Sequence, residues 1–119
     1  MGPNPERPDP RSLGAAGEWR AAEWYRARGY EVVDRNWRCR LGEIDLVCRS
    51  GDLLVICEVK SRSSVSFGAP EEAVTAAKRR RLRRLAARWL AEHRGRHPRV
   101  RFDVASVLGD RVRVVEDAF

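Results

Sequence analysis

The chain has 119 residues, of which 43% are hydrophobic and 34% charged; this composition fits one globular domain and excludes an intrinsically disordered protein. Its net charge of +7 favours an anionic partner, most simply a nucleic acid. Because no apolar run approaches the roughly 18 residues of a membrane span and the first ten residues hold no hydrophobic signal region, we expect a cytoplasmic protein without membrane contact.

The amino-terminal part divides into a tail, a helix and a strand. Residues 1–11 carry four prolines among polar residues, which predicts a disordered tail ahead of a single domain at residues 12–119. Apolar residues then recur with helical spacing over residues 12–28, and the glycine that follows supplies a stop. Residues 30–37 mix β-branched and aromatic side chains with charged ones, which is typical of a strand near a sheet edge.

A β-hairpin is predicted over residues 42–62. Two apolar runs rich in β-branched residues, 44–47 and 53–56, flank the turn signal Ser-Gly-Asp at residues 50–52. A two-residue loop at Gly51 and Asp52 fixes the pairing, because opposed residue numbers then always have the same sum.

This register groups four charged side chains. Asp45 falls opposite Glu58, and Glu43 falls opposite Lys60. Strict alternation along both strands places all four on one face of the sheet. Two acids directly opposite one another destabilise a sheet, so Asp45 and Glu58 require a compensating cation, which a divalent metal ion would supply. The alternatives are two solvated surface acids neutralised by nearby arginines, and a simple Glu43–Lys60 ion pair across the hairpin.

The second half of the chain contains one helix and two strands. A loop is expected over residues 61–69, and Pro70 with the two following glutamates suits a helix start. The helix is predicted at about residues 72–94, with a buried stripe formed by Leu82, Leu85, Ala86, Trp89 and Leu90. Strands are predicted at residues 100–108 and 112–115, joined by a Gly-Asp turn. The expected order is αβββαββ in an α/β fold.

The acids and the lysine suit phosphodiester hydrolysis. This reaction needs a water molecule in line with the leaving oxygen and neutralisation of charge on the phosphoryl group. Mg²⁺ prefers oxygen ligands and needs only one or two carboxylates besides substrate oxygens, which Asp45 and Glu58 provide. Lys60 would orient the attacking water or stabilise the phosphoryl charge. Asp103, in the first of the two final strands, either approaches this site or faces solvent.

The residues also carry a resemblance. The segments GEIDLV at residues 42–47 and EVKSR at residues 58–62 resemble the D…ExK signature of restriction-endonuclease-like nucleases, the PD-(D/E)xK superfamily. Nearly everything after the tail is similar to the YraN-like family of small bacterial proteins, which resemble archaeal Holliday-junction resolvases.

The resemblance implies a restriction-endonuclease-like core, a central mixed sheet flanked by helices, and a set of site residues. By that likeness Asp45 and Glu58 would bind metal, the Val59 carbonyl would add a ligand, and Lys60 would assist the water molecule. Glu18 matches a helix glutamate that completes the site in resolvase-like members. Without the resemblance, Glu18 would be interpreted as a solvent-exposed residue on the polar face of an amphipathic helix.

A basic helix suggests how a nucleic acid would bind. We expect phosphate contacts from Arg62, Lys78, Arg79, Arg81 and Arg84. An ordinary solvated helix face is the alternative reading of these charges. The four tryptophans could stack on unpaired bases, although a small domain needs most of them for its core.

The sequence thus predicts a Mg²⁺- or Mn²⁺-dependent endonuclease acting on DNA in preference to RNA, with branched or single-stranded substrates. A four-way junction offers two related scissile sites, so a homodimer is expected with a resolvase role. The alternatives are a nucleic-acid-binding or partner-docking module without turnover, and a purely structural α/β protein.

Overall fold

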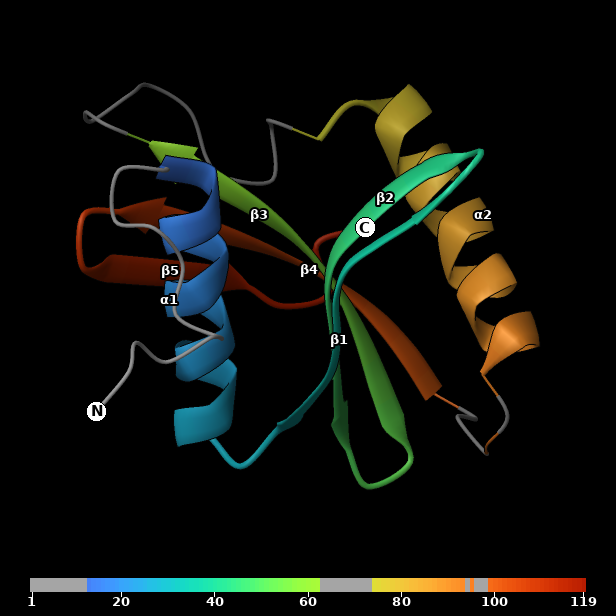
Figure 1. The fold of residues 1–119 in the computed structure, drawn as a ribbon, viewed down its shortest axis with the longest axis horizontal. Coiled ribbons are helices and arrows are strands. Elements are labelled where there is room, and N and C mark those ends of the chain that lie inside the picture. The colour runs from blue at the N-terminus through green and yellow to red at the C-terminus, as the bar shows by residue number, and fades with distance from the viewer. Residues whose placement is uncertain (1–12, 63–73, 94, 96–98) are drawn as a thin grey trace, which may run out of the picture.

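Figure 1 shows the computed structural model of the chain, which describes residues 13–62, 74–93, 95 and 99–119. Its elements are α1 (Leu13–Ala27), β1 (Glu31–Cys39), β2 (Gly42–Ser50), β3 (Leu53–Arg62), α2 (Ala76–Glu92), β4 (Arg99–Leu108) and β5 (Arg111–Val115). The order αβββαββ predicted from the sequence is confirmed. The expected tail at residues 1–11 and most of the expected loop after Lys60 lie outside the described residues.

The five strands form one mixed sheet in the order β1-β2-β3-β4-β5. Strands β3 and β4 are parallel, and the other neighbours are antiparallel. A parallel pair needs a crossover connection, and α2 lies within it. The β2–β3 register runs from Ser50 opposite Leu53 to Leu46 opposite Cys57, the constant sum expected for a two-residue loop. Gly51 adopts a φ of 59° in that loop, a conformation that glycine reaches without steric cost.

Each face of the sheet is covered by one helix (Figure 1). On the α1 face, Ala21, Ala22 and Tyr25 are fully buried against the sheet. On the α2 face, the predicted stripe holds for Leu82, Leu85, Ala86 and Trp89, while Leu90 is partly buried. A sheet covered on both faces needs strands that are apolar throughout, as the central strand β3 is over Leu53–Cys57.

Regular alternation breaks at Asp45 in β2. Ile44 packs in the α2-side core, whereas Leu46, two residues later, packs in the α1-side core. Across from this point on β1, Asn36 has a φ of 51°, a left-handed conformation that asparagine tolerates better than most residues. The expectation that Glu43, Asp45, Glu58 and Lys60 share one face is therefore wrong, since it assumed unbroken alternation through Asp45.

Helix α2 begins later than predicted. Thr75 is its N-cap, and its hydroxyl accepts a hydrogen bond from the Lys78 backbone N–H at 3.2 Å. The helix ends at Glu92, two residues before the expected end. Across the described part of the chain, neither helix is both long and apolar enough to span a bilayer.

Asp103 lies neither at the acidic site nor in solvent. It is completely buried in β4 and accepts hydrogen bonds from the Tyr25 hydroxyl at 2.7 Å and from the Arg101 guanidinium at 2.8 Å. The Asp117 backbone N–H donates a fourth hydrogen bond, at 3.1 Å. A buried charge persists when it is paired and hydrogen-bonded in this way, so Asp103 ties α1 and the carboxyl-terminal segment to the sheet.

Candidate metal centre

Three carboxylates from two elements meet beside the sheet. Glu18 of α1 and Glu43 and Asp45 of β2 each present one oxygen, and these oxygens lie within 4.8 Å of one another. All three residues are half-buried. Carboxylates crowded in this way repel one another, and that repulsion is relieved by a cation or by a proton.

Asp45 is the most perturbed member of this acidic group. Burial raises its pKa from 3.8 to about 8; the carboxylates of Glu58, Glu18 and Glu43 add to the rise. One contact acts in the opposite direction, because the Val59 backbone N–H donates to Asp45 Oδ2 at 2.8 Å. That bond fixes the carboxylate between β2 and β3. A bound divalent cation would favour the ionised form.

A close approach of α1 to the sheet brings Glu18 to the other acids. A Cβ atom added at Gly17 would lie 1.8 Å from the Ser61 side-chain oxygen of β3, so any larger residue requires Ser61 or the helix to shift. Burial raises the pKa of Glu18, and a hydrogen bond from the Asn36 side chain works against that rise. The charges of Glu43 and Glu58 raise this pKa further.

Glu58 is buried next to the acidic group and has a partner of its own. Its side chain is 10% exposed, and its Oε1 lies 2.5 Å from the Lys78 ammonium of α2. Its charge is nonetheless the strongest of the carboxylate influences on Asp45. Glu58 therefore acts on Asp45 through its charge but lies outside the group of three carboxylates, and Lys78, expected on phosphate, is paired with Glu58.

Lys60 is exposed on β3, two residues beyond Glu58. The Glu43 carboxylate, its expected partner across the hairpin, accepts instead from Arg38 of β1 at 2.7 Å. The described β2–β3 pairing reaches no further than Leu46 and Cys57, where β2 turns away. The role of Lys60 toward a water molecule or a phosphate stays a prediction.

Two of the predicted phosphate-binding arginines meet in a surface pocket of about 420 Å³. It is lined by Leu41, Ala77, Arg80, Arg81 and Arg84. Arg79 points elsewhere, with its Nε donating to the Val74 carbonyl at 3.1 Å and its guanidinium 5.6 Å from the Phe119 ring. Arg62 ends β3, on a different element from this pocket.

Sequence reasoning missed three contributors to these surfaces. The sequence predicted Glu43 only as the partner of Lys60. Its position two residues before Asp45 could have indicated a third metal ligand on the same strand. Asn36 gave no such signal, because its hydrogen bond to Glu18 joins β1 to α1, two elements that only the folded structure brings together. Arg80 was one of several adjacent arginines, and only the helix orientation places it with Arg81 and Arg84.

The donor set fits a hard divalent cation. Three carboxylates offer only oxygen ligands, which Mg²⁺ and Mn²⁺ prefer to softer donors. Two oxygens bound to one Mg²⁺ lie at most about 4.2 Å apart, twice the usual bond length. The carboxylate oxygens of the group lie within 4.8 Å of one another, so a small side-chain movement would bring them to the spacing that one ion requires. Glu18, Glu43 and Asp45 could hold such an ion.

Several known proteins similar to this chain are UPF0102 proteins. The family described as "Uncharacterised protein family UPF0102" matches residues 17–107. A UPF0102 protein of Beutenbergia cavernae is 59% identical over 100 residues, which cover 84% of this chain and 85% of the relative. A UPF0102 protein of Nocardia farcinica is 53% identical over 84% of this chain and 79% of its own length. One from Rhodococcus opacus is 46% identical over 91% and 96% respectively.

The matched segment contains the acidic group, Glu58, Lys60, most of α1 and all of α2. These identities extend over most of each chain, as expected for a shared fold. The chain therefore belongs to the UPF0102 family, which confirms the YraN-like resemblance.

Proposed function

We propose that the protein is a Mg²⁺- or Mn²⁺-dependent endonuclease that hydrolyses phosphodiester bonds in branched or single-stranded DNA. The observation that carries the proposal is the group Glu18–Glu43–Asp45, with its oxygens within 4.8 Å and the pKa of Asp45 raised to about 8. Such crowding is costly for a fold, and it is relieved when a divalent cation binds.

Each residue of the site then has a task. A bound divalent cation supplies Lewis-acid stabilisation of the phosphoryl charge. Glu18, Glu43 and Asp45 hold the cation, and the Val59 N–H keeps Asp45 in place. Glu58 and the Val59 carbonyl, implied as ligands by the D…ExK resemblance, complete the set. Lys60, exposed on the same strand, holds the attacking water or faces the phosphate.

The pocket lined by Arg80, Arg81 and Arg84 supports binding of a nucleic-acid backbone. Arginine forms paired hydrogen bonds to phosphate oxygens, and three guanidiniums on one helix face can follow successive phosphates. Lys78 lies on the same helix, at Glu58, so the basic face of α2 leads to the acids. We infer that DNA follows this path.

A cleavage panel tests the proposal. Branched, single-stranded and duplex DNA are incubated with the purified chain, with and without Mg²⁺ or Mn²⁺. Cleavage should require the metal and be abolished by Asp45→Ala. The matched control is Asp52→Ala, which removes an exposed hairpin aspartate paired with Arg99. Equal cleavage by the Asp45→Ala and wild-type proteins would overturn the assignment.

A second candidate is a nucleic-acid-binding module without turnover. It is favoured by the Lys78–Glu58 ion pair, in which a lysine already neutralises a predicted metal ligand. The arginine pocket would serve this function without any metal. In that case affinity for DNA falls steeply with salt concentration but is unaffected by Mg²⁺ and by Asp45→Ala.

A resolvase-type substrate also implies an assembly. A four-way junction has two related scissile sites, so we propose that two copies of the chain act together as a homodimer. Sedimentation of the chain with and without a junction tests this, and a monomer in both samples would exclude it.

A further inference from the structure

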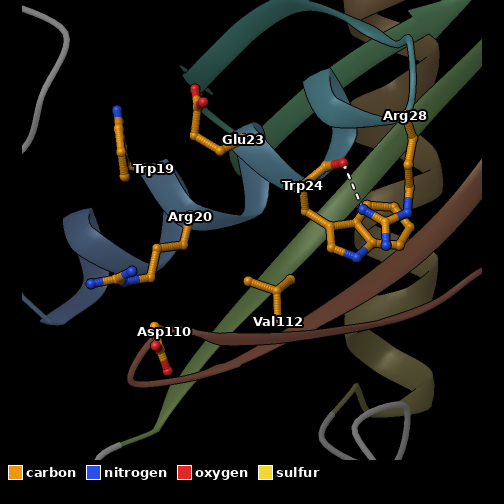
Figure 2. Close-up of a pocket in the computed structure, with 7 residues that line it drawn as sticks. All are labelled: Trp19, Arg20, Glu23, Trp24, Arg28, Asp110 and Val112. Carbon is orange, nitrogen blue, oxygen red and sulfur yellow. Dashed lines mark hydrogen bonds between the residues drawn. The ribbon is translucent and has the colours of Figure 1, made fainter.

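A second pocket is lined by residues of α1, by Arg28 just after it and by the β4–β5 hairpin (Figure 2). It has a volume of about 440 Å³, within the roughly 300–1,000 Å³ typical of small-molecule sites. It is lined by Trp19, Arg20, Glu23, Trp24, Arg28, Asp110 and Val112. None of these residues belongs to the acidic group.

The pocket contains a preformed stack. The Arg28 guanidinium lies over the Trp24 indole, 3.7 Å from the ring centroid, and its Nη1 donates to the Trp24 carbonyl at 3.1 Å (Figure 2). Tyr25 supports the indole in an edge-on contact at 4.9 Å. Arginine planes and aromatic rings are the surfaces on which proteins stack unpaired bases. The stack therefore offers a surface of the right chemistry for a base.

The charges around the stack are balanced. Arg20 and Arg28 contribute two cations, and Glu23 and Asp110 contribute two carboxylates. A pocket for phosphate alone would lack the carboxylates, which repel an anion. Donors and acceptors together match the edge of a nucleobase, which carries both kinds of group.

The pocket is also close to the acidic group along the same helix. Glu18 and Trp24 are six residues apart in α1, which corresponds to about 9 Å along the helix axis and about a third of a turn around it. A stacked strand covers that distance in about three nucleotides, at 3.4 Å each. A base held at Trp24 would thus belong to the strand whose backbone reaches the acids.

We propose that this pocket binds an unpaired nucleobase and so selects single-stranded or branched DNA for the acidic site. This inference rests on the proposed function, since it assigns the substrate class of that site. A base inside a duplex is stacked and paired and cannot reach the Trp24–Arg28 stack. A base in a single strand, or at the arm of a branch, can.

The test measures binding without metal. The anisotropy of a dye-labelled single strand, and of a duplex of the same sequence, is followed in EDTA with the full chain. Trp24→Ala should weaken single-strand binding about 5- to 150-fold, the range for loss of one stacked base. Duplex binding should change less than threefold. Thermal unfolding monitored by circular dichroism checks that each variant is folded.

Arg28 separates stacking from charge and avoids the partly buried tryptophan. Arg28→Ala and Arg28→Lys should both weaken single-strand binding, because lysine keeps the charge but not the plane. Arg113→Ala is the matched control, since Arg113 is exposed on β5 next to Val112 and points to the other face. Full binding by Arg28→Lys, or equal losses for Arg28→Ala and Arg113→Ala on both DNAs, would overturn the proposal.

The two proposals can fail separately. If no DNA is cleaved but single-strand binding still depends on Trp24 and Arg28, the nuclease assignment fails and the base pocket stands. If cleavage depends on Asp45 while the Trp24 and Arg28 variants bind and cleave single strands like the wild type, the base pocket alone is rejected.

Discussion

Lys78 of α2 places its ammonium 2.5 Å from the Glu58 carboxylate of β3, joining the basic helix to the acidic site. The lysine side chain is 37% exposed and the glutamate side chain 10%, so the pair is largely but not fully withdrawn from water. Glu58 thereby has a cation of its own, and in the acidic group Glu43 has one in Arg38, at 2.7 Å.

Removal of this lysine should destabilise the fold. Lys78→Met leaves the Glu58 carboxylate buried without its cation, and we expect the free energy of unfolding to fall by about 1–3 kcal/mol. Urea unfolding at pH 7 measures the change. Arg80→Met, on the exposed side of the same helix, is the control, and Glu58→Gln added to Lys78→Met should recover part of the loss. No change in Lys78→Met would show that the ion pair contributes nothing.

Stability of the metal-free protein should depend on pH through Asp45. Its pKa is 3.8 without perturbation and about 8 in the fold. Between these values the folded chain binds a proton at Asp45 that the unfolded chain has lost, so the contribution of Asp45 to stability is fully present below about pH 4 and is lost as the pH rises toward 8. Urea unfolding of wild type and Asp45→Asn at pH 5 and pH 8 measures this. Asp45→Asn should lose less stability over that interval, and identical slopes would contradict the assignment.

Gly17 and Gly14 should respond in opposite ways to alanine. Gly14 is exposed in the first turn of α1, and a Cβ atom added there has no other atom within 4 Å. Gly14→Ala should therefore raise the free energy of unfolding by about 0.5–1 kcal/mol. Gly17→Ala places a methyl group 1.8 Å from the Ser61 side-chain oxygen and should lower it by about 1–3 kcal/mol.

The same clash should displace Glu18 from the acidic group. Mn²⁺ binding, followed by electron paramagnetic resonance, should therefore weaken in Gly17→Ala and stay unchanged in Gly14→Ala. Addition of Ser61→Gly removes the clashing atoms and should restore both stability and metal binding. If the double variant behaves like Gly17→Ala, the loss has another cause.

Asp103 should be essential for the fold. Asp103→Ala leaves the Arg101 guanidinium and the Tyr25 hydroxyl without their buried partner, and the expected loss is about 3–5 kcal/mol. Tyr25→Phe removes a single hydrogen bond and should cost about 1 kcal/mol. Chemical denaturation measures both. Asp52→Ala, on the surface, should cost less than about 1 kcal/mol, and a similarly small loss for Asp103→Ala would refute its role.

Much of the fold could be predicted because it depends on local patterns. The helical stripe at Leu82, Leu85 and Trp89 and the turn at Gly51 act over a few residues, and the β2–β3 register follows from the loop length. Asp45 and Glu58 were recognised for the same reason, since one hairpin carries both. The start of α2 was less predictable, because the Thr75 cap decided it in place of the earlier Pro-Glu signal.

The composition of the site depended on contacts between distant segments. Alternation predicts a face only while a strand is regular, and the break between Ile44 and Leu46 turned Asp45 toward Glu18. Asp103 looked like a surface or site residue until Tyr25, 78 positions away, and Arg101 were placed around it. No local pattern encodes such partners.

The sequence by itself determined the order of helices and strands, the hairpin register and the presence of Asp45 and Glu58 in one hairpin. Only the tertiary structure decided that Glu43 and Glu18 join Asp45, that Lys78 neutralises Glu58, and that Trp24 and Arg28 line a pocket on the same helix as Glu18. The physical reason is the separation in sequence of the interacting residues. Helix and strand periodicity is set by residues a few positions apart, whereas burial and charge pairing depend on how the helices pack on the two faces of a twisted sheet.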